Sequence, residues 1–537
     1  MQSIISDNER KELLDLAKKT AGNHQIVSCC IYGSKVAGYA RPDSDYDLIL
    51  VLKDYNDLIE YIYYHGDRGL DASILVVDSD ILLKDATKAA LGEFVVGRLL
   101  HPYEPLINDE YLKEVEIAYK KRVILEAIRE LAKTPFYKEF IIPIRYFLLA
   151  KIKERSKIYP HALYSYIKTY TNQFSKKNLE FTLNGFRSAL KLLEEEGYIK
   201  FYDKDSIIIL ADIKYKRNNI ANIINGILAY MVHFYAGRST LNFFRQEAKS
   251  KLKRRKEIRE LDKEFLEPER VLKIRDAILL HEEDWLDELL TYMNVRDHNI
   301  TITKLGDIHA TTTLYKINDN LRLVAKHYAS IKRFKWIGLN AWMIGLVKFD
   351  TDPSQRQLNE YKALRILKEL GFNVPTIIGL SYKYKTTITK YIEGITLDKI
   401  INDILNNKSR DASKIKEFGK LLYSIHNHGY MIKDTKANNV IIHDNKLYLT
   451  DLEQFKKDND YAWDIICFIY YSIKFTSNED TARLIVKAFL DGYTNDNAIN
   501  CKHLIKQALS KKYLPPFYPA LVINTVKAVW KEMHNYL

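Results

Sequence analysis

Four polar residues near the C-terminal end of the chain have the types and the spacing that phosphotransfer requires. The segment MIKDTKANNVIIHDNKLYLTDLEQF carries Asp434, Lys436, Asn439 and Asp451. In a phosphotransfer site an aspartate orients the acceptor hydroxyl or accepts its proton, a lysine neutralises the phosphoryl group in transit, and an asparagine with a second aspartate holds Mg²⁺ between the phosphates. The spacing therefore predicts Asp434 and Lys436 as catalytic residues and Asn439 and Asp451 as Mg²⁺ ligands.

Upstream of this segment, a strand–loop–strand pattern supplies a candidate nucleotide-binding lysine. KLGDIHATTTLYKI is followed by LRLVAKHY, and Lys326 lies on the second predicted strand. Glu360, near the start of the helix predicted in LNEYKALRILKELGFNVP, is the candidate ion-pair partner of Lys326. A lysine and a glutamate on this surface would also be expected by chance, so neither residue is diagnostic without the downstream segment.

Together these motifs resemble protein-kinase-like enzymes of the atypical RIO and lipopolysaccharide-kinase kind. Residues 432–434 (Ile-Lys-Asp) stand where typical protein kinases have His-Arg-Asp, and residues 451–453 (Asp-Leu-Glu) stand where they have Asp-Phe-Gly. The resemblance implies a bilobal kinase fold, ATP as the phosphate donor and Mg²⁺ as the cofactor. It also implies that Asp464 is the buried helix aspartate that braces the catalytic loop.

The same resemblance indicates the remaining nucleotide contacts, with threonine hydroxyl groups replacing most of the glycine-rich loop and a hinge that binds adenine. The expected contacts are, in chain order, Gly306, Thr311, Thr312, Thr313, Tyr391, Ile392 and Glu393. No Ala-Pro-Glu segment follows, and Asp464 comes only 13 positions after Asp451. This short interval leaves little room for a peptide-binding activation segment.

A second set of candidate residues lies near the N-terminus. In IYGSKVAGYARPDSDYDLILVL a predicted strand leads to the turn Gly33-Ser34 and then to Asp45 and Asp47 on the next strand. Residues two apart on a strand project to the same face, so these two carboxylates point to one place. Asp71, which opens the strand DASILVV, is expected to complete an oxygen-only Mg²⁺ site. The backbone amides of Gly33 and Ser34 are expected to approach a triphosphate.

This Gly-Ser turn, Asp-x-Asp pair and later strand aspartate resemble the minimal archaeal form of the DNA-polymerase-β-type nucleotidyltransferase superfamily. The resemblance covers about residues 1–108 and implies a nucleotidyltransferase-like α/β domain. Many such domains have become binding or regulatory modules. Both an active and a non-catalytic first domain therefore stay open.

Between the two sets, the hydrophobic periodicity predicts helices followed by a hairpin. The predicted elements are helices at 110–157, 161–170 and 179–197, strands at 198–202 and 206–210, and a helical segment at 216–292. Helix, helix and hairpin is the order of a winged helix, a fold that contacts either nucleic acid or protein. A small α+β connector without a ligand is the alternative.

The composition excludes several classes of protein. The 537 residues are 47% hydrophobic and 28% charged, with 20 Gly and 12 Pro, as in an ordinary folded multidomain chain. Four cysteines, two of them adjacent, support neither a disulfide framework nor a four-cysteine metal site, so a reducing cytoplasm is the expected setting. No window holds the roughly 20 apolar residues that span a bilayer, and no membrane partner is expected.

The formal net charge of +13 is unevenly distributed. Residues 1–108 hold 11 Lys and Arg against 17 Asp and Glu, residues 109–292 hold 35 against 28, and residues 293–537 hold 36 against 24. A basic balance outside the first domain favours a polyanionic partner such as RNA. Surface lysines without a partner are the alternative.

The full arrangement resembles the archaeal RNA kinase family, and we therefore expect a multidomain α+β protein. The expected domains are a nucleotidyltransferase-like domain (1–108), a helical connector with a winged helix (109–215), a helical segment (216–292) and a kinase-like domain (293–537). The resemblance implies ATP-dependent phosphorylation of the ribose 2′-hydroxyl of a variable-loop uridine in tRNA. The alternatives are an atypical Ser/Thr protein kinase, and a nucleotidyltransferase whose kinase-like domain binds ATP as a regulator.

Overall fold

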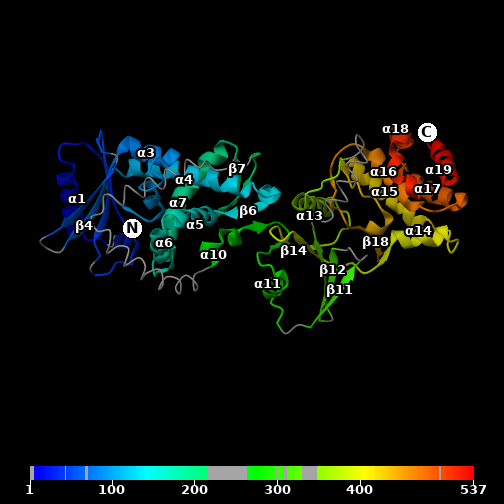
Figure 1. Cartoon of the computed structure of the whole chain (residues 1–537), viewed down its shortest axis with the longest axis horizontal. Helices are drawn as coiled ribbons and strands as arrows, with labels where there is room; N and C mark the ends of the chain where they lie inside the picture. The colour runs from blue at the N-terminus through cyan, green and yellow to red at the C-terminus, as the bar shows by residue number, and fades with distance from the viewer. Residues whose placement is uncertain are drawn as a thin grey trace. The chain divides into compact units, whose positions relative to one another are not determined.

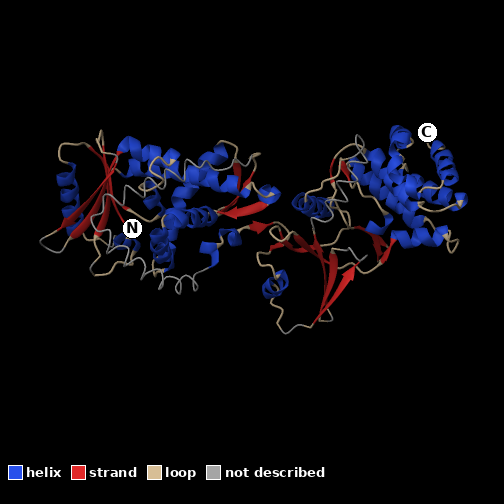
Figure 2. Ribbon diagram, in the orientation of Figure 1, coloured by secondary structure: helices blue, strands red, loops and turns tan. Residues whose placement is uncertain are grey.

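The chain folds into two compact units, Met1–Arg275 and Asp276–Leu537. The computed structural model describes residues 5–42, 44–57, 59–66, 70–213, 263–296, 299–305, 311–318, 320–328, 348–494 and 498–537 (Figure 1). Helices and strands are mixed in both units (Figure 2), as expected for a multidomain α+β protein. Gly306 and the larger part of the predicted helical segment 216–292 lie outside the described residues.

The first unit begins with a five-stranded sheet in the order β3-β4-β2-β1-β5. Its strands are β1 (Ile26–Tyr32), β2 (Tyr46–Leu52), β3 (Ile59–His65), β4 (Asp71–Asp78) and β5 (Glu104–Ile107). β2 and β4 run parallel, and the other neighbouring strands are antiparallel. The sequence predicted the three central strands and missed β3 and β5. Both are edge strands, and neither is buried deeply enough to need a continuous apolar run.

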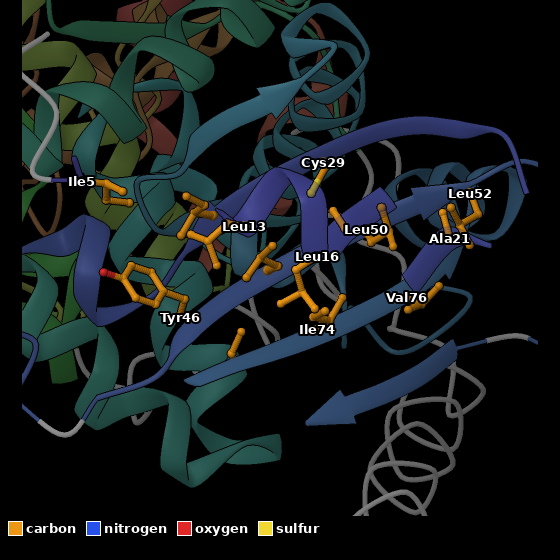
Figure 3. Packing of buried hydrophobic residues seen from close by; sticks show 14 residues of the cluster. Ile5, Leu13, Leu16, Ala21, Cys29, Tyr46, Leu50, Leu52, Ile74 and Val76 are labelled. Atoms are coloured by element: carbon orange, nitrogen blue, oxygen red, sulfur yellow. The ribbon is translucent and has the colours of Figure 1, made fainter. Parts of the chain in front are cut away.

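Helix α1 (Asp7–Ala21) covers one face of this sheet. A capping box between Ser6 and Glu9 satisfies the first free amides of the helix. Leu13, Leu16 and Ala17 recur at helical spacing, so they form one apolar stripe that is buried in the core. Figure 3 shows this stripe meeting the side chains of β2 and β4. The sheet that carries the N-terminal aspartates is therefore held by a close-packed core.

The rest of the first unit contains helices and a four-stranded sheet in the order β7-β8-β6-β9. Its helices are α2 (Ser34–Ala37), α3 (Ser79–Lys88), α4 (Asp109–Leu131), α5 (Arg145–Ile158), α6 (Pro160–Thr171), α7 (Ser175–Glu195) and α10 (Lys263–Leu266). Its strands are β6 (Phe140–Pro143), β7 (Ile199–Asp203), β8 (Ser206–Ile209) and β9 (Lys273–Ile274). The predicted order of helix, helix and hairpin is present, and Gly197 adopts a φ of 77° after α7.

The helical pattern predicted over residues 110–157 is present at both ends and is interrupted in the middle by a short strand. The short run FIIP forms β6, which pairs with both β8 and β9. Its phenylalanine and isoleucines favour a β-strand. Proline lacks an amide hydrogen, and it is tolerated here because it lies at the end of the strand. A sequence of only four strand residues between two long helices gives no alternating pattern to detect.

The second unit opens with a six-stranded sheet in the order β10-β14-β15-β13-β12-β11. Its strands are β10 (Ile278–Leu279), β11 (Ile300–Leu305), β12 (Thr312–Ile317), β13 (Leu321–His327), β14 (Ile377–Ser381) and β15 (Thr386–Lys390). Helices α11 (Trp285–Tyr292) and α13 (Pro353–Glu369) belong to the same part of the chain. The prediction of an entirely helical segment 216–292 is wrong at β9 and β10, because these two-residue strands complete the edges of existing sheets.

A mostly helical part completes the second unit (yellow to red in Figure 1). Its helices are α14 (Leu397–Leu405), α15 (Ser413–Asn427), α16 (Tyr461–Ser472), α17 (Glu479–Tyr493), α18 (Ala498–Ala508) and α19 (Ile523–His534), with the short helices η4 (Ala437–Asn439), η5 (Lys511–Tyr513) and η6 (Pro515–Ala520). Its strands are β16 (Ile395–Thr396), β17 (Tyr430–Met431), β18 (Val440–His443), β19 (Lys446–Leu449) and β20 (Lys456–Lys457). None of the described helices has the length and apolar composition that a bilayer crossing requires. All four cysteines are buried and free.

Candidate active site

A buried ion pair joins β13 to α13 in the second unit. Lys326 Nζ lies 2.6 Å from Glu360 Oε2, and the Tyr328 hydroxyl donates to the same carboxylate oxygen at 2.6 Å. Burial by itself would lower the pKa of Lys326, but the neighbouring carboxylates raise it well above its ordinary value. Lys326 is therefore a fixed cation, and Glu360 orients it.

Three carboxylates converge on this lysine. One oxygen each of Glu360, Asp451 and Glu453 lies within 4.8 Å of the others. Lys326 Nζ contacts Asp451 directly and lies 3.5 Å from Glu453 Oε2. Glu453 also accepts from Arg356 Nη1 at 3.1 Å, and both of these side chains are buried. The arrangement brings the predicted nucleotide lysine and the predicted metal aspartate to one point.

The sequence did not indicate a role for Glu453 or Arg356. The available signal for Glu453 was its position in Asp-Leu-Glu, where typical protein kinases have a glycine. Arg356 gave no signal, because an arginine on the first turns of a helix is normally exposed. Their burial appears only in three dimensions.

The loop that carries Asp434 is braced by Asp464 of α16. The backbone amides of Ile432 and Lys433 each donate to the Asp464 carboxylate at 2.8 Å, and His426 Nε2 lies 3.1 Å from it. The Thr435 hydroxyl donates to the Asp464 backbone carbonyl at 2.7 Å. These contacts confirm the bracing role that the sequence predicted for Asp464.

The braced loop holds Asp434, Lys436 and Asn439 together. Lys436 Nζ lies 2.6 Å from Asp434 Oδ1, and Asn439 Nδ2 donates to the Asp434 carbonyl at 3.0 Å. Burial opposes a charge on Lys436, but Asp434 raises its pKa above the ordinary value, so Lys436 is a cation. The Thr450 amide donates to the Asn439 carbonyl at 2.9 Å, which places Asn439 beside the residue preceding Asp451. Carboxylate and amide oxygens from these two positions suit Mg²⁺.

The threonines of the predicted phosphate loop lie next to Lys326. Thr312 pairs with Lys326 across β12 and β13, so their side chains share a face, and Thr313 pairs with Ala325. The Thr311 carbonyl accepts from the His327 amide at 2.9 Å, and its buried hydroxyl has no hydrogen-bond partner among the described residues. Thr312 is thus placed to face phosphates beside Lys326, whereas Thr313, the next residue on the strand, projects from the opposite face of the sheet.

The predicted hinge forms the connection between β15 and β16. The Tyr391 amide donates to the Arg322 carbonyl at 3.0 Å, and Arg322 Nη1 lies 3.0 Å from the exposed carboxylate of Glu393. Ile392 lies between them. A Cβ on Gly394 would come 2.2 Å from the Ile442 carbonyl oxygen, so this connection requires a glycine to pass over β18.

In the first unit, the structure brings together part of the predicted aspartate cluster. Gly33 has a φ of 80°, and a Cβ there would lie 2.2 Å from Asp47 Oδ2, so the glycine turn fits directly over this carboxylate. Burial and then the charge of Asp45 raise the pKa of Asp47 to about 7, against the opposing effect of Arg98. Ser73 donates a hydrogen bond to Asp45.

Asp71 does not join this pair as predicted. The parallel register sets Ser73 opposite Asp47, and the half-exposed Asp71 lies 3.3 Å from His65 Nδ1. Among the described residues, a group of three potential ligands within 4.8 Å occurs at Glu360, Asp451 and Glu453 and not at the N-terminal aspartates. Asp71 is the first residue of β4 and comes two positions before Ser73. It therefore lies at the end of the strand, and Ser73 is the residue opposite Asp47.

A pocket of about 740 Å³ opens beside Ser34 of the glycine turn. It is lined by Ser34, Tyr39, Arg41, Ser44, Tyr164, Lys168, Thr171 and Asn172. Among the residues that the structure describes, the lining contains two cations and several hydroxyl groups, and no carboxylate. Its chemistry suits a small anion.

Comparison with known proteins finds similarity over part of the chain. No family model matches it. Over 98 residues, or 18% of this chain, it is 28% identical to the KEOPS complex subunit Bud32 of Pyrococcus abyssi, and the match spans 43% of that protein's length. A solved structure of WaaP in complex with acyl carrier protein covers 44% of this chain and 98% of its own, at 10% identity and a TM-score of 0.28. The chain thus contains a protein-kinase-like region over part of its length.

Proposed function

We propose that the chain is an ATP-dependent kinase that transfers the γ-phosphate to a ribose 2′-hydroxyl of tRNA. The observation that carries the phosphotransfer part is the contact of the buried Lys326–Glu360 pair with Asp451. A lysine held in this way can fix ATP phosphates while a metal-binding aspartate stands beside them. The match to part of Bud32 supports the same chemistry.

Each residue of the site has a separate role in the proposed reaction. Asp434 orients the acceptor hydroxyl and takes its proton as the bond to phosphorus forms. Lys436, 2.6 Å from Asp434, balances the charge on the phosphoryl group in transit. Lys326 holds the donor phosphates. Asn439 and Asp451 would hold Mg²⁺, which neutralises charge on the phosphate oxygens when bound.

The segment after Asp451 favours an acceptor other than a peptide. Strand β20 pairs with β17, the strand that immediately precedes the catalytic loop. The Gln454 side chain accepts from the Asp350 amide at 2.8 Å and donates to the Asp350 carbonyl at 3.1 Å. Residues 454–457 are therefore held against the protein by the Gln454 side chain and the short β17–β20 ladder. Together with the basic charge of residues 293–537 and the resemblance to archaeal RNA kinases, this supports RNA as the acceptor.

The domain assignments belong to the same proposal. Residues 1–108 would form a nucleotidyltransferase-like domain, residues 109–215 a connector with a winged helix, and residues 293–537 the kinase-like domain. Strand β10 of the 216–292 segment adds an edge to the kinase-like sheet.

Incubation of the full chain with [γ-³²P]ATP and either tRNA or a protein extract tests the proposal. We expect label in tRNA for the wild type and none for Asp434→Asn. Label confined to protein would contradict the RNA acceptor and favour the protein-kinase alternative. Absence of transfer to both would contradict the kinase function.

A second candidate function is supported in the first unit by the pocket beside Ser34 and the Asp45–Asp47 pair. These features suit a nucleotide-binding or nucleotidyltransferase domain. The same incubation with [α-³²P]ATP distinguishes the two reactions, because only nucleotidyl transfer moves the α-phosphate. Transfer of α-label that is lost in Asp47→Ala and kept in Asp434→Asn would establish the second function.

A further inference from the structure

Three large apolar side chains are exposed together on the helical part of the second unit. Phe475 is 74% exposed, Tyr518 60% and Ile523 71%. Two hydrogen bonds hold their segments side by side: the Phe475 amide donates to the Ala520 carbonyl, and the Thr525 hydroxyl donates to the Thr476 carbonyl, both at 2.8 Å. Exposed aromatic rings in such a group usually mark a binding surface.

The segment that carries Tyr518 and Ile523 is rich in positive charge, whereas Glu479 and Asp480 follow Phe475 at the start of α17. Residues 497–531 contain six lysines and no Asp or Glu. All six lysines are exposed, and none forms an ion pair with another described residue. Lys511 and Lys512 precede Tyr518 in consecutive short helices, Lys527 follows Ile523 by one turn, and the exposed Lys474 adjoins Phe475.

This surface is connected to the candidate catalytic loop by direct contacts. Lys436 Nζ lies 4.7 Å from the centre of the Tyr471 ring, and that ring lies 5.4 Å from Phe517. Phe517 is the neighbour of Tyr518 in η6. An acceptor bound across the exposed rings would therefore lie within a few side chains of Asp434.

We propose that Phe475 and Tyr518, with Lys474, Lys511, Lys512 and Lys527, form a platform for unpaired nucleotides of the RNA acceptor. This inference rests on the proposed function and names the form of RNA that the site accepts. Unpaired bases can stack on exposed aromatic rings while lysines contact the phosphates, whereas bases in a duplex are already stacked. Six lysines without an acidic side chain over residues 497–531 are complementary to a densely negative partner such as an RNA backbone, and less so to a protein surface of mixed charge.

Binding of a fluorescent 12-nucleotide oligo(U) to the full chain, followed by anisotropy, tests the platform without requiring catalysis. We expect Phe475→Ala and Tyr518→Ala each to raise the Kd about tenfold or more. Tyr518→Phe keeps the ring and should keep the affinity. Tyr292→Ala, at a 57% exposed tyrosine on α11, is the matched control and should also bind as the wild type does. Lys511→Ala with Lys512→Ala should reduce the slope of log affinity against log salt by about 0.7 for each lost phosphate contact.

The platform is refuted if the two alanine variants bind oligo(U) like the wild type, or if a 12-base-pair duplex binds as tightly as the single strand. Loss of self-association in these variants with unchanged RNA affinity would instead identify a protein-docking surface and refute it equally. The proposed function fails separately, if the wild type binds oligo(U) as described but transfers no phosphate to any RNA. In a chain that does transfer, the alanine variants should raise KM for tRNA more than they lower kcat.

Discussion

Asp434 and Asp451 are carboxylates with different surroundings, and the difference predicts different mutant behaviour. Asp434 lies against Lys436 on the braced loop, whereas Asp451 contacts the nucleotide lysine Lys326. Asp434→Asn should abolish transfer and leave ATP affinity nearly intact, because this residue acts on the acceptor. Asp451→Asn should weaken Mg²⁺-dependent ATP binding. Calorimetric titration with ATP and Mg²⁺ compares the two, and equal affinities would contradict the assignment.

At this scale the sequence predicted most of the kinase-like site. Lys326, Glu360 and Asp451 converge, and so do Asp434, Lys436 and Asn439, and the distinctive spacing of the segment 434–451 is what made this site recognisable in the sequence. The prediction that Asp71 joins Asp45 and Asp47 did not hold, because the strand register decides which residue lies opposite Asp47, and that residue is Ser73. It missed Arg356 and Glu453 because buried charges look like surface charges in a sequence.

Helix α13 is joined to the segment after Asp451 by buried polar contacts. Arg356 contacts Glu453 at 3.1 Å, and Asn359 Nδ2 donates to Asp350 Oδ2 at 2.8 Å and to the Glu453 carbonyl at 3.2 Å. Glu360 is one turn further along α13. These contacts fix the position of α13 and so hold Glu360 toward Lys326.

We predict that Arg356→Met lowers both stability and kcat, because it removes the nearer of the two cations beside the buried Glu453 carboxylate and leaves Lys326, 3.5 Å away and shared with Glu360 and Asp451, as the other. The loss in unfolding free energy should be at most about 3–5 kcal/mol, the cost of a buried charge with no partner. The double variant Arg356→Met/Glu453→Gln removes both charges and should recover part of the loss. A double-mutant cycle from thermal unfolding and kcat measures the coupling. Additive effects of the two substitutions would show that the contact does not position α13.

The buried histidine His101 of the first unit predicts that the folded state loses stability in acid. His101 stacks on Tyr166 of α6 with a ring separation of 4.4 Å, and its Nδ1 lies 3.0 Å from the Thr169 hydroxyl. Burial, followed by the charges of Arg155 and Arg98, lowers the pKa of His101 to about 3.

Because the unfolded chain binds this proton near pH 6.5 and the folded chain only near pH 3, the contribution of His101 is complete above pH 6.5 and is lost as the pH falls toward 3. The full change is about 4–5 kcal/mol. Thermal unfolding of the wild type and His101→Gln between pH 7 and pH 4 checks it. The wild type should lose stability more steeply with acid than the variant; parallel curves would contradict the buried neutral histidine.

Elements were predicted well where their residues form long periodic runs and poorly where partners define them. The helices α6 and α7 and the central strands of the first sheet have continuous patterns of their own. The strands β6, β9 and β10 are two to four residues long and exist because another strand offers free hydrogen-bonding groups. No local pattern specifies such a strand before the partner is placed.

For the whole molecule, the two candidate metal-binding sites have opposite electrostatic settings. Residues 1–108 are acidic on balance and residues 293–537 basic. An RNA backbone is therefore attracted to the second region without help from a bound cation. We infer that phosphotransfer belongs entirely to the second unit, with the first unit affecting substrate capture or stability.

The variant Asp45→Ala/Asp47→Ala should accordingly transfer γ-label to RNA within about tenfold of the wild type, a change of roughly 1.4 kcal/mol in transition-state free energy. Asp434→Asn should lose several orders of magnitude in the same assay. Circular dichroism confirms folding of both variants. Equal losses would make the first unit part of the catalytic apparatus and contradict this division.

The position of the transferred phosphate tests the central claim most directly. A 2′-phosphate blocks the attack of the 2′-oxygen on the neighbouring phosphodiester, so alkaline hydrolysis cannot cleave the RNA there. After incubation of tRNA with [γ-³²P]ATP and the wild type, alkali should release the label in a resistant dinucleotide, and Asp434→Asn should give no label. Label released as a mononucleotide, or as a phosphate at a tRNA end, would contradict transfer to an internal ribose 2′-hydroxyl.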